Sequence, residues 1–153
     1  MNTLARYLSG VRKIRSLGSV PETSYYPPLA ELLGTIGQGI SPKVRCVVYP
    51  KSQGAGIPDL ALFSADQIPA NGEPRAGVIP SRGVIEAKGV GEDINRIAAS
   101  KQVAKYLERY GQVLVTNLRE FLLVTSAAGV GEQFTLADSE AAFWSDTGDS
   151  RHA

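Results

Sequence analysis

Two short stretches of this sequence decide its fold: Ile57-Pro58-Asp59-Leu60-Ala61-Leu62-Phe63 and Gly83-Val84-Ile85-Glu86-Ala87-Lys88. Each is a largely apolar run bounded by Gly or Pro, which is typical of a buried strand. Successive side chains of a strand point to opposite faces, so Glu86 and Lys88 share a face while Ala87 faces away. If the two strands pair, Asp59 joins them, and three charged groups converge at one end of a sheet.

Such a trio of charges has a plain interpretation and a functional one. On an exposed edge strand the three groups would be ordinary surface charges. The apolar residues around them indicate covered strands, where ionisable groups are costly unless a metal or a substrate compensates. A divalent ion takes carboxylate oxygens, and a water that attacks phosphorus needs a nearby cation to hold it as hydroxide. Asp59 and Glu86 are therefore candidate metal ligands, and Lys88 the candidate cation, of a phosphodiester-cleaving site.

Helical periodicity surrounds these strands. One helix is predicted from a cap at Asn2 or Thr3 to Gly18, and a second from residues 26–28 to Gly37. A third is predicted over 93–110, with Asp93 as its cap and Ala104 facing inward, and a short fourth over 138–144, capped by Asp138. Helices thus precede and follow the candidate site.

Further strands complete a mixed sheet. Besides 59–63 and 83–88, strands are predicted over 44–49, 112–116 and 120–125, with a last edge strand around Phe134. The two charged strands should form an antiparallel hairpin across the Pro- and Gly-rich connection 64–82, and the helix after them should cross over to another strand. This order predicts an α/β fold, a three-layer sandwich with a central mixed β-sheet flanked by helices.

Length and composition fit one domain. The chain has 153 residues, 43% of them hydrophobic and 20% charged, and no apolar stretch approaches the roughly 18 residues of a membrane helix. We expect the domain to span 1–137, followed over 138–153 by the short helix and an acidic, disordered tail. Cys46 is the single cysteine, which fits a reducing, cytoplasmic location.

Several classes of chemistry are disfavoured. His152 is the only histidine and lies one residue from the end, which argues against His-dependent nucleases, Ser-His-Asp hydrolases and most zinc sites. A P-loop motif is missing from the sequence. The chemistry should therefore depend on carboxylates and lysine.

The net charge of +1 is unevenly distributed. Residues 1–137 carry +4 and residues 138–153 carry −3. The first predicted helix has a basic face, made of Arg6, Arg12, Lys13 and Arg15. This face is either solvated or directed at phosphates, and charge alone does not decide between the two.

The acidic and basic residues also match a known pattern. Pro58-Asp59, followed 27 positions after the aspartate by Glu86-Ala87-Lys88, resembles the signature of the PD-(D/E)XK nuclease superfamily, the fold of many restriction endonucleases and resolvases. Glu31 matches the extra carboxylate that this superfamily often carries on a helix before the first strand. The resemblance implies a restriction-endonuclease-like fold and a Mg²⁺ site, with Mn²⁺ as a substitute.

Roles for the individual residues follow from that resemblance. Asp59, Glu86 and Glu31 would bind the metal together with the Ala87 carbonyl, and Lys88 would steady the attacking water as hydroxide.

Two more residues match the family on the helix after the lysine strand. Gln102 and Tyr106, one helical turn apart, match its Gln-x-x-x-Tyr pattern. Gln102 would orient the site or touch the substrate backbone. A solvated Gln102 and a Tyr106 that only fills the core stay open as alternatives.

The wider stretch of about 24–125 resembles the N-terminal nuclease domains of large single-chain restriction-modification enzymes, through Tyr26-Pro27-Pro28, Gly56-Ile57-Pro58-Asp59 and Thr116-Asn117-Leu118-Arg119-Glu120-Phe121. It implies double-stranded DNA as substrate, helicase and methyltransferase domains of a longer chain as partners, transient pairing of two copies on DNA, and no membrane. Two alternatives stay open: a catalytically silent nucleic-acid-binding or scaffolding domain of the same fold, and a small Holliday-junction-type resolvase.

Overall fold

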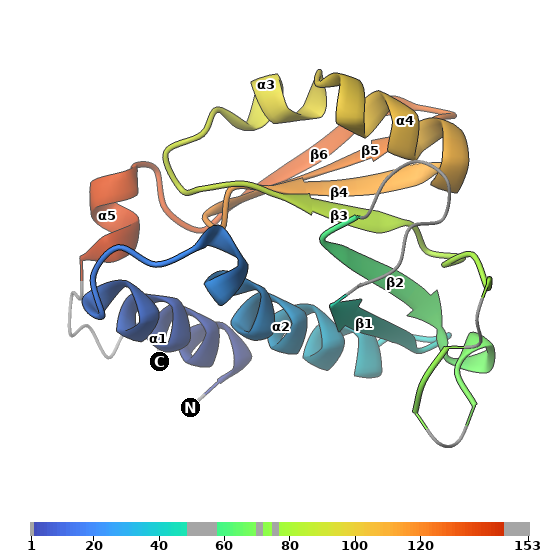
Figure 1. Ribbon diagram of the computed structural model, residues 1–153, viewed down its shortest axis with the longest axis horizontal. Coiled ribbons are helices and arrows are strands. Elements are labelled where there is room, and N and C mark those ends of the chain that lie inside the picture. Colours follow the sequence, from blue (N-terminus) through green and yellow to red (C-terminus); the bar gives the residue numbers. More distant parts are fainter. Residues whose placement is uncertain (1, 49–57, 70–71, 75–76, 146–153) are drawn as a thin grey trace.

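The computed structural model describes residues 2–48, 58–69, 72–74 and 77–145. Within these residues, six strands form one sheet in the order β1-β2-β3-β4-β5-β6 (Figure 1). The predicted tail beyond Ser145, the end of the first predicted strand at Tyr49, and Ile57 before the second predicted strand lie outside the described residues. The strands are β1 Val44–Val48, β2 Leu60–Ser64, β3 Val84–Ala87, β4 Gln112–Thr116, β5 Glu120–Thr125 and β6 Gly129–Thr135.

The sheet is mixed. β1 with β2 and β2 with β3 pair antiparallel, β3 with β4 pairs parallel, and β4 with β5 and β5 with β6 pair antiparallel. The parallel pair is joined by a crossover through two helices, α3 Ile94–Ala98 and α4 Lys101–Tyr110. The predicted hairpin of β2 and β3, the crossover and the edge strand around Phe134 are thereby confirmed.

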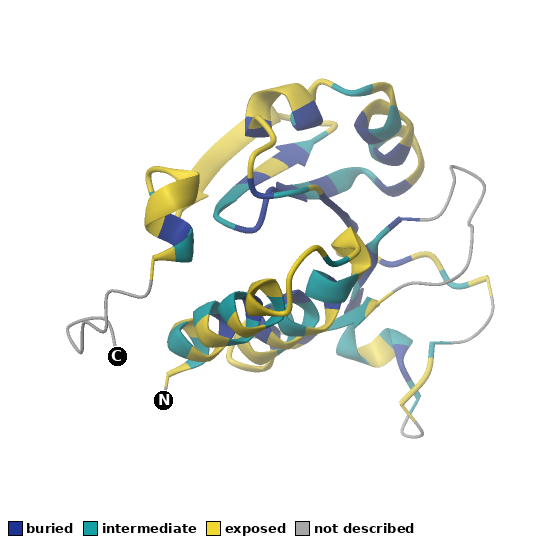
Figure 2. Ribbon diagram, turned by 60° about the vertical axis from the view of Figure 1, so that its left-hand side comes forward, coloured by how far each residue is buried: buried dark blue, intermediate teal, exposed yellow. Residues whose placement is uncertain are grey.

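Helices cover both faces of the sheet and give three layers. α3 and α4 lie on one face, over a core that includes Val84, Val103 and Val113. On the other face lie α1 Thr3–Ser16, the 3₁₀ turn η1 Glu22–Tyr25, α2 Tyr26–Gln38 and α5 Glu140–Trp144. Their core includes Val11 and Leu29. Figure 2 shows the contrast between β3, whose residues are all buried, and β6, whose residues are all exposed.

The first two helices follow their predicted limits. Asn2 caps α1 by accepting a hydrogen bond from the amide of Ala5 at 2.7 Å, and α2 begins with prolines in its first turn. Among the described helices, none combines the length and apolarity needed to cross a membrane.

The predicted helix over 93–110 is two helices, and the prediction of one continuous helix is wrong. Asp93 caps α3 as predicted. The Ser100 hydroxyl then accepts from the amide of Val103 at 3.2 Å and starts α4, because serine satisfies a new helix start better than it continues an old one. Ala104, predicted to face inward, is exposed. Because the chain changes direction at Ser100, α4 packs on the core through a separate face, made of Val103, Tyr106 and Tyr110.

The short helix α5 is capped by Ser139 and not by Asp138 as predicted, since the Ser139 hydroxyl accepts from the amide of Ala142 at 3.0 Å. Phe143 of α5 is fully buried in the core beneath α1 and α2. Arg12 donates to the Phe143 carbonyl at 3.0 Å, and the Arg15 guanidinium lies 4.4 Å from the centre of the Trp144 ring. Two cations of the basic α1 face therefore hold α5.

Candidate active site

The site lies where β2 and β3 separate. Their last paired residues are Leu60 and Ile85, whereas β3 stays paired with β4 through Ala87 and Thr116. The Ala87 amide on the β2 side then has no strand partner, and it donates to Asp59 Oδ2 at 2.8 Å. The Asp59 side chain thus takes the place of a main-chain acceptor, directly after Pro58 and before β2 begins.

A second donor fixes Asp59 from the helix layer. Tyr26, at the first position of α2, donates its hydroxyl to Asp59 Oδ1 at 2.7 Å. Burial, and next the hydrogen bond to Asp59, raise the pKa of Tyr26 above its ordinary value, so its phenol stays a proton donor. Both carboxylate oxygens are therefore oriented, one by α2 and one by β3.

Glu86 lies beside Asp59 and is only 4% exposed. The two side chains are hydrogen-bonded to each other. Burial first, and then the charge of Asp59 and this hydrogen bond, raise the pKa of Glu86 to about 7, against the opposing effect of Lys88. Burial beside a second carboxyl group therefore favours the protonated form of Glu86.

Lys88 completes the group at the end of β3. Its Nζ lies 3.5 Å from Glu86 Oε1, and its side chain is 46% exposed. Burial lowers the pKa of Lys88, but the charges of Glu86, Glu22 and Asp59 outweigh this effect, and the net pKa is raised. Lys88 is therefore a stable ammonium that borders the carboxyl pair and also faces solvent. The structure brings together Asp59, Glu86 and Lys88 as the sequence predicted.

A further carboxylate, which sequence reasoning missed, lies near Lys88. Glu22 begins η1, the turn that leads into α2. Its pKa is raised, first by burial and then by the charges of Asp59 and Glu92, while Lys88 and a hydrogen bond from the Gly89 amide act in the opposite direction. The one signal in the sequence is an acid four positions before Tyr26, in a segment without helical or strand periodicity.

The structure places Glu31 away from this group. Its carboxylate pairs with Arg6 of α1 at 3.1 Å, and its side chain is 53% exposed. Five residues separate Glu31 from Tyr26, which turns it by about 140° around the helix axis. Because Tyr26 faces Asp59, Glu31 faces elsewhere, into a surface depression that it lines with Arg45 and Cys46 of β1.

The helix α4 contributes from the opposite layer. Tyr106 is buried, and its pKa is raised to about 12, mainly by burial; a hydrogen bond with Gln102 lowers it and the charges of Glu86 and Asp59 raise it further. Tyr106 is thus both a core residue and a neighbour of the two carboxyl groups. Gln102, its hydrogen-bond partner, is half-buried one turn nearer the start of α4.

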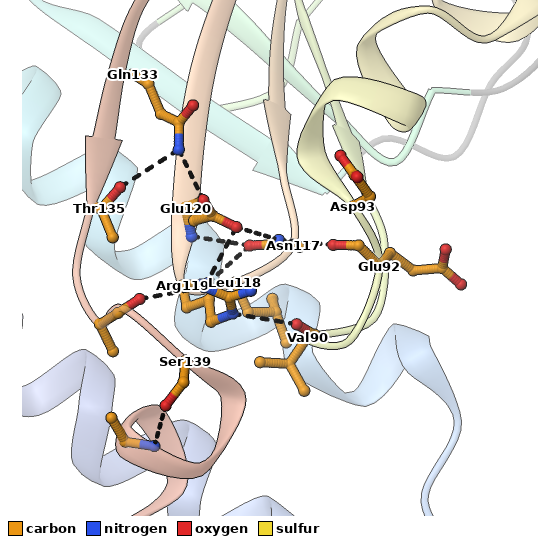
Figure 3. Close-up of polar contacts among 12 residues, drawn as sticks. Val90, Glu92, Asp93, Asn117, Leu118, Arg119, Glu120, Gln133, Thr135 and Ser139 are labelled. Atoms are coloured by element: carbon orange, nitrogen blue, oxygen red, sulfur yellow. Dashed lines mark hydrogen bonds and ion pairs between the residues drawn. The ribbon is translucent and has the colours of Figure 1, made fainter.

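A polar network holds the loop that follows Lys88 (Figure 3). Asn117, fully buried at the β4–β5 turn, donates to the Glu92 carbonyl at 2.8 Å and to Glu120 Oε1 at 2.9 Å. Its side-chain oxygen accepts from the amides of Arg119 and Glu120 at 3.3 and 2.8 Å. The Asn117 side chain therefore makes hydrogen bonds both within its own turn and to the loop beside the site.

Arg119 holds the same loop at a second point. Its guanidinium donates to the Val90 carbonyl at 3.3 Å and to the Ala137 carbonyl at 3.2 Å, and it pairs with Glu120 at 3.3 Å. Between Asn117 and Arg119, Leu118 has a φ of 79°, in the left-handed region. Its carbonyl accepts from Tyr7 of α1 at 2.7 Å. This turn therefore links α1 to the loop that follows Lys88.

The chemistry of the donor set fits a hard divalent ion. Asp59, Glu86 and the Ala87 carbonyl offer oxygen donors only, and Mg²⁺ is commonly held by one or two carboxylates with waters in its remaining positions. No cluster of three or more His, Cys, Asp or Glu side chains suited to a metal occurs among the described residues. Oxygen donors of this kind suit Mg²⁺ better than an ion that prefers thiolate or imidazole ligands.

Comparison with known proteins identifies a similar fold among solved structures. No protein-family model matches the chain, and no curated protein matches it. Among solved structures, the chain is similar to one in a cryo-EM structure of a DrdV–DNA complex, with a TM-score of 0.64 and 19% sequence identity. The match covers 92% of this chain and 13% of the other, so this chain spans a small part of that protein's length. The likeness shows the fold and confirms the predicted α/β architecture.

Proposed function

We propose that this chain is a Mg²⁺-dependent endodeoxyribonuclease domain of the PD-(D/E)XK superfamily. One observation carries the proposal: two adjacent, hydrogen-bonded carboxyl groups, the half-buried Asp59 and the buried Glu86, lie with Lys88 at the point where β2 and β3 separate. The fold similarity to a protein solved in complex with DNA supports DNA as the partner. The sequence resemblance further favours the nuclease module of a restriction-modification enzyme that acts on double-stranded DNA.

The proposed roles follow from charge and position. Asp59 and Glu86, with the Ala87 carbonyl, would hold the ion. When bound, Mg²⁺ supplies Lewis-acid polarisation of the phosphate and a lower pKa for a bound water. Tyr26 and the Ala87 amide keep the Asp59 carboxylate aimed, since each occupies one of its oxygens. Lys88 offsets the charge that develops on the phosphate in the transition state.

A silent binding domain explains the site less well. The buried Glu86 beside Asp59 destabilises the metal-free protein at pH values where Glu86 must ionise. A module that only binds DNA gains nothing from that cost. A resolvase would use the same residues, so the shape of the DNA substrate is what separates it from a restriction-type nuclease.

The test is cleavage by the purified chain of supercoiled plasmid, linear duplex, nicked duplex and a four-way junction, with Mg²⁺, with Mn²⁺ and with EDTA. Lys88→Ala should fold and bind DNA like the wild type while cleavage falls about 10²–10³-fold, the magnitude typical of losing transition-state charge stabilisation. Arg6→Ala, which removes a cation outside the site, is the matched control. Cleavage that persists in Lys88→Ala or in EDTA would reject this assignment.

A further inference from the structure

Helix α4 carries a row of cations at every fourth position. Lys101, Lys105 and Arg109 are all exposed, and Glu108 is the one acid within α4. Residues four apart lie almost above one another on a helix, so the row extends about 12 Å along the axis. The opposite side of α4 is buried through Val103, Tyr106 and Tyr110. The helix therefore presents one basic flank and one core-facing flank.

The basic flank lies on the side of the proposed active site. At about 100° per residue, Lys105 lies roughly 60° around the axis from Gln102, and Arg109 roughly 60° from Tyr106. The charges of Glu86 and Asp59 raise the pKa of Tyr106, so this residue of α4 lies near the two carboxyl groups. Lys105 and Arg109 thus lie beside the site-facing edge of the helix, whereas Lys101 lies between that edge and the outer surface around Ala104.

The direction of the helix sets which end of the row is near the site. α4 ends two residues before β4, and β4 begins beside the first residues of β3, with Val113 opposite Val84. The other end of α4, with Lys101 and Gln102, lies towards the end of β3 that bears Glu86 and Lys88. The cations therefore lead away from the carboxyl pair along one edge of the α3–α4 layer.

Lys101 and Lys105 of α4 differ from the arginines of α1. On α1, Arg6 pairs with Glu31, Arg12 holds the Phe143 carbonyl and Arg15 stacks over Trp144. For Lys101 and Lys105, no ion pair is found within the part of the chain that the structure describes. Two lysines four residues apart repel each other slightly, a cost that an anionic partner removes.

We propose that Lys101, Lys105 and Arg109 form the surface that binds the phosphate backbone of the DNA beside the scissile bond. The inference deepens the proposed function, on which it rests for the choice of DNA as partner. Such a surface contributes affinity and position through counterion release, and it selects no base sequence. It also assigns the side of the active site from which the duplex extends.

The test compares two double charge reversals with the same change in net charge. Lys101→Glu/Lys105→Glu removes the proposed contacts, and Lys13→Glu/Lys43→Glu places the same charges on exposed positions of α1 and of the segment before β1. Binding of a fluorescent 20-base-pair duplex is measured by anisotropy in EDTA over a salt series, and plasmid nicking is measured with Mg²⁺. Thermal melts establish that each variant is folded, and Lys101→Gln/Lys105→Gln serves if the reversal does not fold.

The α4 reversal should weaken duplex binding at least about tenfold and make the salt slope shallower by about 2, the effect of losing two phosphate contacts. The control should change affinity less than about threefold. Equal losses in both variants, or unchanged binding in the α4 variant, would overturn the proposed surface. Plasmid nicking that is retained alongside unchanged binding leaves the nuclease proposal standing, whereas a wild type that binds through α4 but never nicks refutes the nuclease and keeps the surface.

Discussion

The two sides of β3 behave differently, and the candidate site lies on only one of them. Towards β4, pairing runs to the end of the strand, and the Lys88 amide still donates to the Thr116 carbonyl at 2.9 Å. Towards β2, pairing stops at Ile85, and side chains take over from the main chain. We call the fully paired side towards β4 the closed side and the side towards β2 the open side. The closed side fixes the position of Lys88, and the open side leaves space for a ligand beside the carboxyl groups. An interrupted sheet thus combines rigidity and access at neighbouring residues.

The largest effect is expected from breaking the closed side. Asn117→Ala leaves the Glu92 carbonyl and two turn amides without their side-chain partner in a buried place, so the free energy of unfolding should fall by about 2–3 kcal/mol. Urea unfolding measures this loss. Gln133→Ala, which removes an exposed amide bonded to Glu120, is the control and should change stability by less than about 0.5 kcal/mol. Equal losses of stability in the two variants would contradict the proposed importance of the buried Asn117 hydrogen bonds.

Removing one charge of the Asp59–Glu86 pair, on the open side, should raise the stability of the metal-free protein instead of lowering it. Glu86→Gln keeps a hydrogen-bonding group beside Asp59 but cannot ionise, so the metal-free protein should be stabilised by about 1–2 kcal/mol at pH 8 while cleavage is lost. The folded pKa of Glu86, about 7, lies above its ordinary value of 4.5, so the wild type loses stability as the pH rises through this interval.

The gain from Glu86→Gln should therefore shrink at pH 5, where the carboxyl is largely protonated in the folded protein. Melting temperatures in EDTA at both pH values check this. A destabilised variant at pH 8 would contradict the account of the pair.

On the open side, Tyr26→Phe deletes one hydrogen bond to Asp59 and leaves the ring in place. Tyr26 acts through Asp59, so the half-saturating Mg²⁺ concentration should rise and cleavage at limiting Mg²⁺ should fall about tenfold, equivalent to roughly 1.4 kcal/mol. High Mg²⁺ should restore most of the rate. A rate loss that excess Mg²⁺ does not relieve would place Tyr26 in the chemistry itself.

The smallest effect separates two glutamates. Glu22 borders Lys88, and Glu31 pairs with Arg6, so Glu22→Gln should lower the cleavage rate several-fold and Glu31→Gln less than about twofold. Single-turnover cleavage of one duplex measures both. The reverse order would restore Glu31 to the site.

The sequence predicts the centre of the site better than its surroundings, for a physical reason. Strand parity and a hairpin are enough to bring Asp59 to Glu86, because both are short-range rules. The choice between Glu31 and Glu22 depends on the rotational phase of α2, and Glu22 lies in a turn that has no periodicity at all. The Tyr26 hydroxyl meets a partner 33 positions away, which helix-start signals do not encode. The break at Ser100 was hidden because a buried stripe can continue across a change of helix.

The packing of α5 determines where this domain can be truncated or fused to another protein. Phe143 fills the hydrophobic interior beneath α1, and Arg12 and Arg15 reach across to its neighbours. A domain that ended at residue 137 would lose Phe143 from this core. It would expose the apolar residues that Phe143 covers and remove the α5 contacts of Arg12 and Arg15. Grafting this module onto another protein therefore requires joining the linker after α5, not before it.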